Sequence, residues 1–341
     1  MPAPRTIDQF LDVLKKSGVL DENRLETRAG QLLTSASPPH DPTGLAGILV
    51  REGFLTRWQA DQFLQGKSRG FQIGKYNILD RLGSGGMSCV YLCKDQTLPL
   101  RVAVKVLPKS MADDETMLKR FYREARATAT LDHPHVIHAY AIDQTDQFHY
   151  MVMEYVDGKS LEEIVQKDGP LSVAKAVRYV RQAAAGLQYI HETGLVHRDI
   201  KPGNLLLEYA NDSIKILDMG LARFFNDNEE LLTRGVLGTV DYFAPEQTMD
   251  SHAVDSRADI YSLGGTMSFL LTGSPPFEGG TVIQKIQGHR RLDPRPIRAL
   301  RPDVPEDLVA VILRMMAKDP AQRYQNPSEV RQALAPWEKA R

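Results

Sequence analysis

The chain changes its hydrophobic pattern twice, and the order of these patterns constrains its fold more than any other sequence feature. Residues 1–70 carry apolar side chains at helical spacing, short β-type runs follow at 76–82, 90–93 and 102–107, and helical spacing returns after Gly158. Each segment is suited to one kind of element, because helices and strands bury side chains with different periods. The sequence therefore predicts an α+β chain with a helical N-terminal segment, a β-rich lobe and an α-rich lobe.

Finer patterns predict single elements within the two lobes. One long helix should begin after a cap at Ser172 and end at Gly194, because the apolar residues between them step by four and three. The apolar stretch 263–271 is too short and interrupted to span a membrane and predicts a buried core helix. The other expected elements are a helix at 113–131 and strands at 136–142, 149–155, 205–207 and 214–217.

Residues 1–70 contain a weak internal repeat that appears at a shift of 35 residues. In each copy an apolar stripe runs into a glycine suited to a helix C-terminus, and a capping side chain then starts a second helix. The matched pairs are Phe10 with Leu45, Leu14 with Leu49, Gly18 with Gly53, Leu20 with Leu55 and Asp21 with Thr56. The pattern predicts two helical hairpins, and the prolines of the linker at 35–43 should continue neither helix.

The charge balance argues against a nucleic-acid binder. Lys plus Arg is 42 and Asp plus Glu is 43, a formal net charge of −1, and residues 1–70 hold 9 basic and 8 acidic side chains. Phosphate contacts need a surplus of cations, so a helix-turn-helix DNA reader is disfavoured for the N-terminal hairpins. A regulatory or protein-docking module is the favoured interpretation, and a folded appendage that binds nothing is the alternative.

Cysteine usage and hydropathy indicate a soluble chain of the cytoplasm. Cys89 and Cys93 are too few and too close together for a disulfide framework, so packing on a strand is favoured over a metal or redox role. The first residues show no secretory signal, and no run reaches the roughly 18 apolar residues of a membrane span. We expect no membrane insertion in this chain, and an anchor beyond Arg341 in a longer natural protein stays open.

Two features of the β-rich segment are compatible with a phosphate site. The run Gly83, Ser84, Gly85 and Gly86 lets backbone N–H groups approach phosphate oxygens, although a tight hairpin would explain it as well. In the next strand Lys105 stands among apolar residues. A buried ammonium needs a counter-charge, which Glu124 on the following helix can supply; a lysine on a solvent-facing edge is the alternative.

Three further motifs follow in order: His-Arg-Asp-Ile-Lys-Pro-Gly-Asn at 197–204, Asp-Met-Gly at 218–220 and Ala-Pro-Glu at 244–246. With the glycine-rich run and Lys105 they resemble the signature set of protein kinases. The chain is identified as a member of the bacterial eukaryotic-like serine/threonine protein kinases. The resemblance implies a bilobal protein-kinase fold at 76–337, with an N-lobe at 76–156 and a C-lobe at 157–337, after the all-α hairpin module at 1–70.

The resemblance also implies a role for each motif residue, because phosphoryl transfer depends on positioning and on electrostatic stabilisation. Asp199 should accept the proton of the substrate hydroxyl, and Lys201 should neutralise the γ-phosphate of ATP. The other assignments are Lys105 on the α- and β-phosphates, Glu124 as the partner of Lys105, and Asn204 and Asp218 on Mg²⁺, with Mn²⁺ as the alternative cation.

An adenine pocket and three scaffold residues are implied in the same way. His197, Asp259 and Arg323 should be structural, with Arg323 paired to Glu246. Met153 should be the gatekeeper, and the backbone of Glu154 and Val156 should bond to the base. The full set of expected nucleotide contacts is Leu82, Gly83, Ser84, Gly85, Gly86, Val90, Ala103, Lys105, Met153, Glu154, Val156 and Leu206.

Two positions depart from the family pattern. Ser88 stands where a third glycine is usual, and Met219 stands where phenylalanine is usual, but neither change removes a catalytic group. We therefore expect an active kinase that phosphorylates Ser or Thr of proteins and signals through this activity. Thr233 is the expected activating autophosphorylation site, modified by the same chain or by a second copy in a homodimer. A pseudokinase scaffold that binds nucleotide without transferring phosphate is the alternative.

Overall fold

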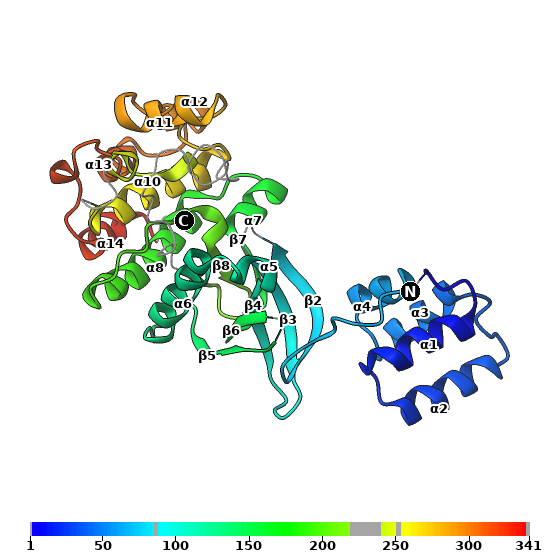
Figure 1. Ribbon diagram of the computed structural model, residues 1–341. Helices are drawn as coiled ribbons and strands as arrows, with labels where there is room; N and C mark the ends of the chain where they lie inside the picture. The colour runs from blue at the N-terminus through cyan, green and yellow to red at the C-terminus, as the bar shows by residue number, and fades with distance from the viewer. Residues whose placement is uncertain (1, 85–87, 147, 219–239, 250–253, 339–341) are drawn as a thin grey trace. The chain divides into compact units, whose positions relative to one another are not determined.

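The computed structural model describes residues 2–84, 88–146, 148–218, 240–249 and 254–338 (Figure 1). It divides into two compact units. Met1–Leu118 and Tyr140–Tyr155 form the first unit, and Lys119–Ala139 and Val156–Arg341 form the second. The helical N-terminal segment therefore belongs to the same compact unit as the β-rich segment.

The first unit combines the N-terminal helices with a mainly antiparallel sheet, and α6 (Glu115–Ala129) continues from it into the second unit. Its helices are α1 (Ile7–Ser17), α2 (Glu22–Leu33), α3 (Pro42–Arg51), α4 (Arg57–Leu64) and α5 (Lys109–Ala112). Its strands are β1 (Gln72–Ile73), β2 (Tyr76–Ser84), β3 (Cys89–Asp95), β4 (Arg101–Pro108), β5 (Ala139–Gln144) and β6 (Phe148–Glu154). Among the described residues they form one sheet in the order β1-β2-β3-β4-β6-β5.

The two predicted helical hairpins are present, as α1–α2 and α3–α4. Gly18 ends α1 in the left-handed conformation with φ 66°, and the side chains of Asp21 and Thr56 accept the capping hydrogen bonds of α2 and α4. The linker prediction extended two residues too far, because Pro42 and Thr43 are the first residues of α3. Proline fits there because the first helical N–H has no intrahelical acceptor and the ring presets φ.

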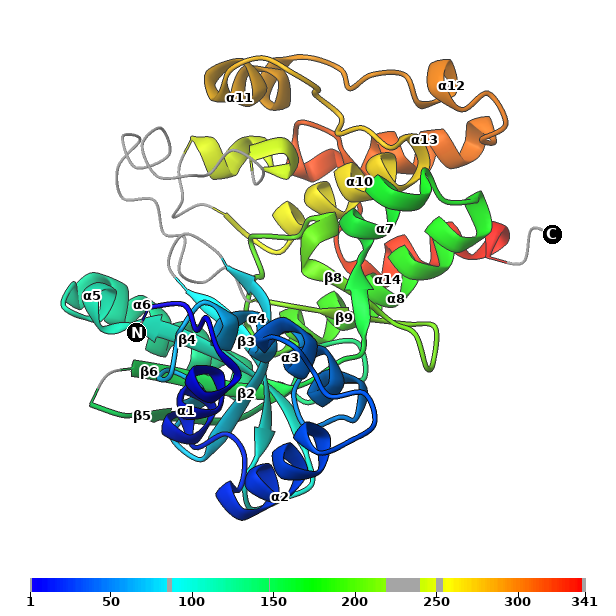
Figure 2. The same cartoon turned by 90° about the vertical axis from the view of Figure 1, so that its right-hand side faces the viewer.

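The helices of 1–70 have their own hydrophobic core, which includes Phe10, Leu45 and Phe63 and extends to Phe71 just before the sheet. A second core lies on one face of the sheet and includes Val104 and Val152. Trp58 of α4 packs against both cores. Figure 2 looks onto α1–α4 with strands β2 and β3 behind them.

The second unit is mainly helical and carries the predicted strand pair. Its strands β7 (Gly158–Ser160), β8 (Leu205–Glu208) and β9 (Ser213–Ile216) form a small antiparallel sheet. Its α-helices are α7 (Leu161–Asp168), α8 (Val173–Glu192), α10 (Arg257–Thr272), α11 (Val282–Arg291), α12 (Ile297–Leu300), α13 (Glu306–Met315) and α14 (Pro327–Leu334). Short 3₁₀ turns lie at Pro202–Asn204, Val240–Tyr242, Pro245–Thr248, Pro320–Gln322 and Ala335–Trp337.

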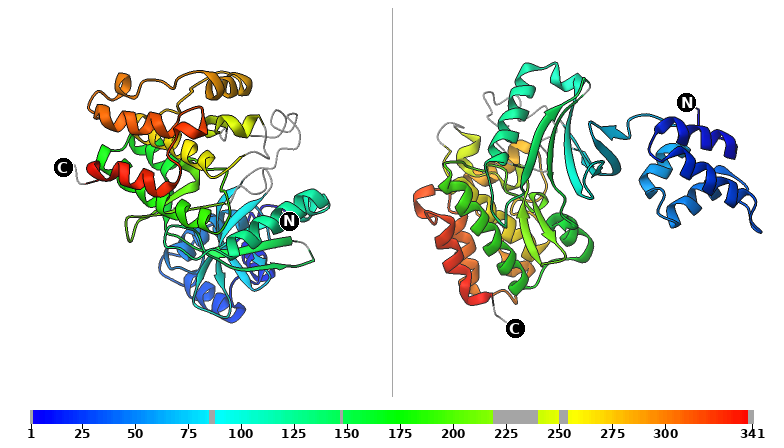
Figure 3. Two further views of the ribbon diagram at one scale, coloured as in Figure 1. Left: turned by 90° about the vertical axis from the view of Figure 1, so that its left-hand side faces the viewer. Right: turned by 90° about the horizontal axis from the view of Figure 1, so that it is seen from below.

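The core of the second unit is built around α8 and α10. Helix α8 begins after the predicted cap Ser172, and α10 is buried along its apolar stretch, as the sequence predicts. Helices α8 and α14 lie side by side, where Arg181 donates to the carbonyl of Arg331 at 3.1 Å (Figure 3). Among the described residues no helix has both the length and the apolar composition that crossing a bilayer requires.

The strand expected at 136–142 is displaced. The strand β5 begins only at Ala139, whereas Val136, three residues before it, makes an isolated parallel bridge to Ile216. The N–H of Ile137 donates to the carbonyl of Ile216 at 2.9 Å. The apolar run was therefore predicted correctly as extended, but its first residues pair with β9 of the second unit. The apolar periodicity of 136–142 cannot distinguish pairing with β9 from pairing in the sheet of the first unit, because the same side chains would be buried in either arrangement.

Candidate active site

The loop at 197–204 lies between α8 and β8 and brings three polar side chains together. The amide Nδ2 of Asn204 donates to the carbonyl of Asp199 at 2.8 Å and to its carboxylate Oδ2 at 2.9 Å. The ammonium of Lys201 lies 3.3 Å from the same Oδ2. Asp199 and Asn204 are buried. The same oxygen of the Asp199 carboxylate is thus contacted by both an amide and an ammonium.

The backbone of this loop is anchored by a buried carboxylate. Asp259 in α10 accepts from the N–H of His197 at 2.9 Å and from the N–H of Arg198 at 2.7 Å. The ring Nε2 of His191 lies 2.7 Å from the same side chain. Burial alone would raise the pKa of Asp259, but the hydrogen bond and charge of His191 and the backbone N–H of Arg198 lower it. The expected scaffold role of Asp259 is confirmed by this geometry.

Arg198 adopts a left-handed backbone conformation with φ 66°, which is uncommon for a residue with a side chain. Its two flanking peptide groups are both held. Asp259 accepts from its N–H, and the side chain of Gln247 donates to its carbonyl at 2.9 Å. Such conformations persist where surrounding contacts determine them and are concentrated at functional sites. The contacts therefore fix the direction in which the following residue, Asp199, leaves the backbone.

His197 is fully buried, and both of its ring nitrogens contact backbone groups. Its Nε2 lies 2.9 Å from the carbonyl of Leu217, and its Nδ1 lies 3.2 Å from the N–H of Asp199. A carbonyl needs a donor and an N–H needs an acceptor, so the partners assign a neutral ring protonated at Nε2. This supports the expected structural role of His197.

Asn204 and Asp218 are neighbours at the end of the β8–β9 pair. The N–H of Leu217 donates to the carbonyl of Asn204 at 2.9 Å, which places Asp218 directly after a residue bonded to Asn204. Asp218 also has a left-handed backbone, with φ 46°. Because the amide nitrogen of Asn204 is directed to Asp199, its amide oxygen is the atom left for a cation. One hard amide oxygen and one carboxylate are a donor set that suits Mg²⁺.

In the first unit, strand register places four expected nucleotide contacts on one face of the sheet. Val90 pairs with Lys105, and Ala103 pairs with Met153. Directly paired residues share a face, and alternate residues along a strand do too. Val104 lies on the opposite face, in the sheet core. The ammonium-bearing face therefore also carries the apolar residues expected around adenine.

Lys105 is only 8% exposed, so the alternative of a solvent-facing lysine is wrong. Its expected partner Glu124 is buried as well, in α6. Glu124, Val156 and Leu206 belong to the second unit, and Lys105 belongs to the first. The pairing of Lys105 with Glu124 therefore stays a prediction.

Among the remaining expected contacts, Glu154 ends β6, and Leu82, Gly83 and Ser84 lie at the end of β2. Gly83 pairs with Val90, and Ser84 ends β2. Leu82 is 47% exposed, a large value for a leucine in a sheet and one that leaves its side chain available to a ligand. Gly85 and Gly86 lie outside the described residues, as do Met219 and Thr233.

Arg323 forms a buried ion pair that ties the Ala-Pro-Glu segment to the C-terminal part of the second unit. Its guanidinium donates to the two carboxylate oxygens of Glu246 at 2.6 and 2.8 Å. Arg323 also donates to the carbonyls of Arg257, Ala317 and Lys318. The expected pairing is confirmed. The bidentate geometry suits the planar fork of an arginine and would not be reproduced by lysine.

Sequence reasoning missed two residues of this site, His191 and Gln247. His191 reaches Asp259 from α8, and Gln247 reaches the 197–204 loop from the turn after Ala-Pro-Glu. Gln247 directly follows Glu246, so its position beside a motif was the one available signal. His191 sits at the end of a helix with no neighbouring motif, and its role depends on a contact 68 residues away in sequence.

Comparison with known proteins places this geometry in a family. The family model described as protein kinase domain matches residues 76–335. The chain belongs to the protein kinase family. Its helical C-lobe and β-sheet N-lobe agree with the expected kinase fold, and its N-terminal helices precede the matched region.

The curated relatives of this kinase chain include bacterial kinases. It is 40% identical over 265 residues to serine/threonine-protein kinase PknB of Mycobacterium leprae, covering 76% of this chain and 42% of the relative. It is 36% identical over 257 residues to serine/threonine-protein kinase PrkC of Bacillus subtilis, covering 75% and 39%. The expected similarity to bacterial eukaryotic-like serine/threonine kinases is confirmed, and the chain spans less than half the length of these relatives.

Solved structures give the same result for the fold. The kinase domain of Mycobacterium tuberculosis PknI is 30% identical with a TM-score of 0.62, covering 79% of this chain and 98% of that one. A structure of Rad53 residues 1-466 in complex with AMP-PNP is 27% identical with a TM-score of 0.64, covering 77% and 65%.

Proposed function

We propose that this chain transfers the γ-phosphoryl group of ATP to serine or threonine hydroxyl groups of proteins, itself included, and that it signals by doing so. The observation that carries the proposal is the arrangement around Asp199, whose carboxylate is held by Asn204 and approached by Lys201. This arrangement provides a proton acceptor and a cation beside it, the two groups needed at an attacked γ-phosphate.

In the proposed reaction Asp199 orients the substrate hydroxyl and accepts its proton as the oxygen attacks the γ-phosphorus. Lys201 stabilises the charge on the phosphoryl oxygens as the bond to the β-phosphate oxygen breaks. Because Asp259 and Gln247 fix the backbone before Asp199, little reorganisation is needed at the moment of transfer. ADP leaves with the charge that the broken bond releases.

Asn204 and Asp218 are the residues proposed to hold Mg²⁺, with Mn²⁺ as the alternative. The amide oxygen of Asn204 and the carboxylate of Asp218 fit a hard divalent cation, since both are oxygen ligands at the same end of the β8–β9 pair. When bound, the cation would neutralise charge on the β- and γ-phosphates. The hydrogen bonds from Asn204 to Asp199 would couple the cation site to the proton acceptor.

The nucleotide is proposed to bind on the sheet face that carries Lys105. Val90, Ala103 and Leu82 would contact the adenine from the first unit, and Leu206 would contact it from the second. Met153 would limit the depth of the pocket, and the backbone of Glu154 and Val156 would bond to the base. Lys105, held by Glu124, would bind the α- and β-phosphates. Gly83, Ser84, Gly85 and Gly86 would surround the phosphates with backbone N–H groups.

Residues 1–70 are proposed as a regulatory or docking module and 76–337 as the catalytic domain. The module shares a compact unit with the sheet that carries the proposed nucleotide-binding face, so contacts of the module with the sheet can affect nucleotide binding. A chain that starts at residue 71 should differ from the full chain in ATP affinity, oligomeric state or both. If calorimetry and sedimentation give identical values for the two chains, the module has no regulatory role.

The cytoplasm is the proposed site of action, because ATP is available there and both cysteines are free. Burial raises the pKa of the Cys93 thiol to about 12, so this cysteine is a packing residue of β3 and not a reactive thiolate.

Phosphorylation of matched peptides tests the proposed activity. Three peptides that differ only in having Ser, Thr or Tyr at one position should show phosphate gain on Ser or Thr and none on Tyr, with ATP and Mg²⁺ present. Omitting the divalent cation should abolish the gain. If ATP binds but no peptide and no residue of the chain gains phosphate, the pseudokinase alternative is correct.

A further inference from the structure

The first turn of α4 is bonded to strand β2 as well as to itself. Thr56 and Gln59 form a capping box, in which Thr56 Oγ1 accepts from the N–H of Gln59 at 3.1 Å and Gln59 Oε1 accepts from the N–H of Thr56 at 3.0 Å. The same two side chains donate to the sheet. Gln59 Nε2 donates to the carbonyl of Ile78 at 2.7 Å, and Thr56 Oγ1 donates to the carbonyl of Leu79. A capping box that only completes the N-terminus of a helix does not require its side chains to donate to a strand.

The two carbonyls lie at an irregular part of β2. Strand β1 pairs with β2 only at Tyr76 and Asn77, and the N–H of Ile78 still donates to the carbonyl of Phe71 at 2.8 Å. The β2–β3 register then shifts between Ile78 and Asp80, so Leu79 has no direct partner on β3. Thr56 and Gln59 therefore bond to carbonyls of β2 at a bulge, just after the pairing of β1 with β2 ends. Strand pairing constrains the backbone least at such positions.

The contact between Gln59 and β2 is buried. Gln59 is only 3% exposed, and a buried amide donor without an acceptor would cost free energy. Trp58, between the two residues, packs edge-on against Tyr91 of β3 at 6.4 Å between ring centroids. Helix α4 thus contacts both strands that lead to the glycine-rich run. Tyr91 pairs with Val104, so this contact is on the face opposite to Lys105.

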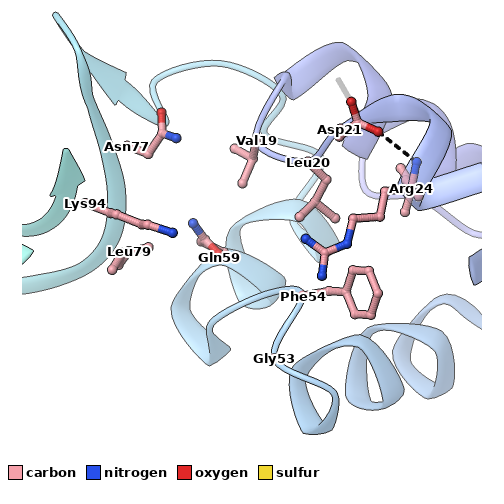
Figure 4. A pocket seen from close by; sticks show the side chains of 11 residues that line it. Val19, Leu20, Asp21, Arg24, Gly53, Phe54, Gln59, Asn77, Leu79 and Lys94 are labelled. Atoms are coloured by element: carbon pink, nitrogen blue, oxygen red, sulfur yellow. Dashed lines mark hydrogen bonds between the residues drawn. The ribbon is translucent and has the colours of Figure 1, made fainter. Parts of the chain in front are cut away.

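A cavity of about 270 Å³ borders the contact, and Figure 4 shows Gln59 on its wall. Leu20 and Phe54 line it from the helices, and Leu79 and Lys94 line it from the strands. The packing beside α4 is therefore incomplete on this side, where Thr56 and Gln59 bond to β2.

We propose that Thr56 and Gln59 are positioning residues for the nucleotide, because they hold the bulged segment of β2 in the conformation that presents Leu82 and Gly83 to ATP. Leu82 lies three residues beyond Leu79, next to a second register shift between Arg81 and Gly83. A strand with two irregularities has few ladder bonds of its own to fix this stretch. The inference rests on the proposed nucleotide site and adds to it a connection from the N-terminal helices.

The chain contains a matched control for this contact. Helix α1 begins with the same residue types, Thr6 and Gln9, and Thr6 Oγ1 accepts from the N–H of Gln9 at 3.3 Å. Gln9 Oε1 accepts from the N–H of Arg5 at 2.8 Å, and both side chains are exposed. No hydrogen bond from Thr6 or Gln9 to a strand is present among the described residues. The pairs Gln59→Glu and Gln9→Glu keep the capping acceptor and add the same charge, but only Gln59→Glu removes a donor to β2.

The test compares steady-state kinetics and calorimetric ATP affinity of the full chain. Gln59→Glu should raise the KM and the Kd for ATP by about fivefold, the scale of one lost hydrogen bond, with kcat within about twofold of the wild type. Gln9→Glu should change neither constant. Backbone hydrogen exchange at Leu82 and Gly83 should be faster in Gln59→Glu alone. Thr56→Val should act in the same direction, and Thr56→Ser, which keeps the hydroxyl, should restore wild-type affinity.

The inference is overturned if ATP affinity is unchanged in both Gln59→Glu and Thr56→Val. It is also overturned if both variants are unfolded at the assay temperature in thermal melts, because the contact would then be one of global stability. A wild-type chain that transfers no phosphate would contradict the proposed function alone, since the Kd ratio between variants is measured without turnover and still decides this inference.

Discussion

The side chain of Asn204 is joined to Asp199 by two hydrogen bonds, one to the carbonyl at 2.8 Å and one to the carboxylate at 2.9 Å. This relationship gives Asn204 two tasks. Its nitrogen orients the proton acceptor, and its oxygen remains for the cation. The proposed metal site and the proposed base are therefore parts of one hydrogen-bonded unit, and damage to one should affect the other.

Replacement of Asn204 tests this coupling. Asn204→Ala should lower kcat on the order of 10²–10³-fold, the range found when one group is removed from a preorganised electrostatic site. The Mg²⁺ concentration for half-maximal rate should also rise, because an oxygen ligand is lost. The measurement is the rate as a function of Mg²⁺ concentration. Asn211→Ala is the control, since Asn211 donates to Glu208 at the exposed turn of the same strand pair. Equal kinetics for Asn204→Ala and the wild type would refute the coupling.

The buried histidine of α11 should make stability depend on pH. Burial, with a smaller effect of the charge on Lys318, lowers the pKa of His289 to about 3 from its ordinary value of 6.5. Above pH 6.5 neither state binds the proton. Below it the unfolded chain does and the native chain does not, so the free energy of unfolding falls as pH falls from about 6.5 toward 3.

Urea unfolding between pH 6.5 and 4 measures this effect. In His289→Gln the free energy of unfolding should fall less steeply, by up to about 1.4 kcal/mol per pH unit, which is the effect of one proton. Glutamine keeps a polar partner for the hydroxyl of Tyr261, which lies 2.9 Å from His289 Nδ1. His40→Gln, in the exposed linker before α3, controls for the loss of a histidine as such. A slope identical to that of the wild type in His289→Gln would show that this group does not titrate on unfolding.

Thr233, outside the described residues, is predicted to be the activating phosphorylation site. Between Asp218 and Glu246 the serine and threonine positions are Thr233 and Thr239, and by family resemblance Thr239 contacts the catalytic loop. A phosphate at Thr233 would pair with a cation such as Arg198, which directly precedes Asp199. Thr233→Ala should lower the rate about tenfold or more, the scale of one charge-assisted hydrogen bond. Thr27→Ala, at an exposed position of α2, is the control.

Phosphopeptide mapping accompanies these kinetics. The wild-type chain should carry phosphate on Thr233 after incubation with ATP, and phosphatase treatment should reduce its rate to that of Thr233→Ala. Phosphate found only outside 218–246, or a wild-type rate in the alanine variant, would reject the switch.

Local signals predicted much of this fold. The caps at Asp21, Thr56 and Ser172 and the turn glycine Gly18 act within a few residues of their own position, so their effects can be read from sequence. The pairing of Val136 with Ile216 could not, because it joins segments 80 residues apart that have equivalent apolar patterns. Thr56 shows both what local signals predict and what they do not. Its capping role was predicted, whereas its hydrogen bond to Leu79 depends on a bulge in β2 that the local sequence does not predict.

For the candidate site, too, local motifs were predictable and long-range contacts were not. Motif spacing and family resemblance predicted Asp199, Asn204 and the anchoring by Asp259. His191 and Gln247 were missed because each acts through one long-range contact to a backbone or carboxylate group. The pairing of Lys105 with Glu124 remains a prediction that the separate compact units do not test.

The central claim is tested most directly by the rate at which a single equivalent of ATP gives up its γ-phosphoryl group to the chain, followed by intact-mass spectrometry with Mg²⁺ present. The wild-type chain should gain phosphate. Asp199→Asn should bind ATP with the same Kd and gain phosphate on the order of 10²–10⁴-fold more slowly, because it lacks the proton acceptor. Equal rates for the two chains, or no gain in a wild-type chain that binds ATP, would contradict the account.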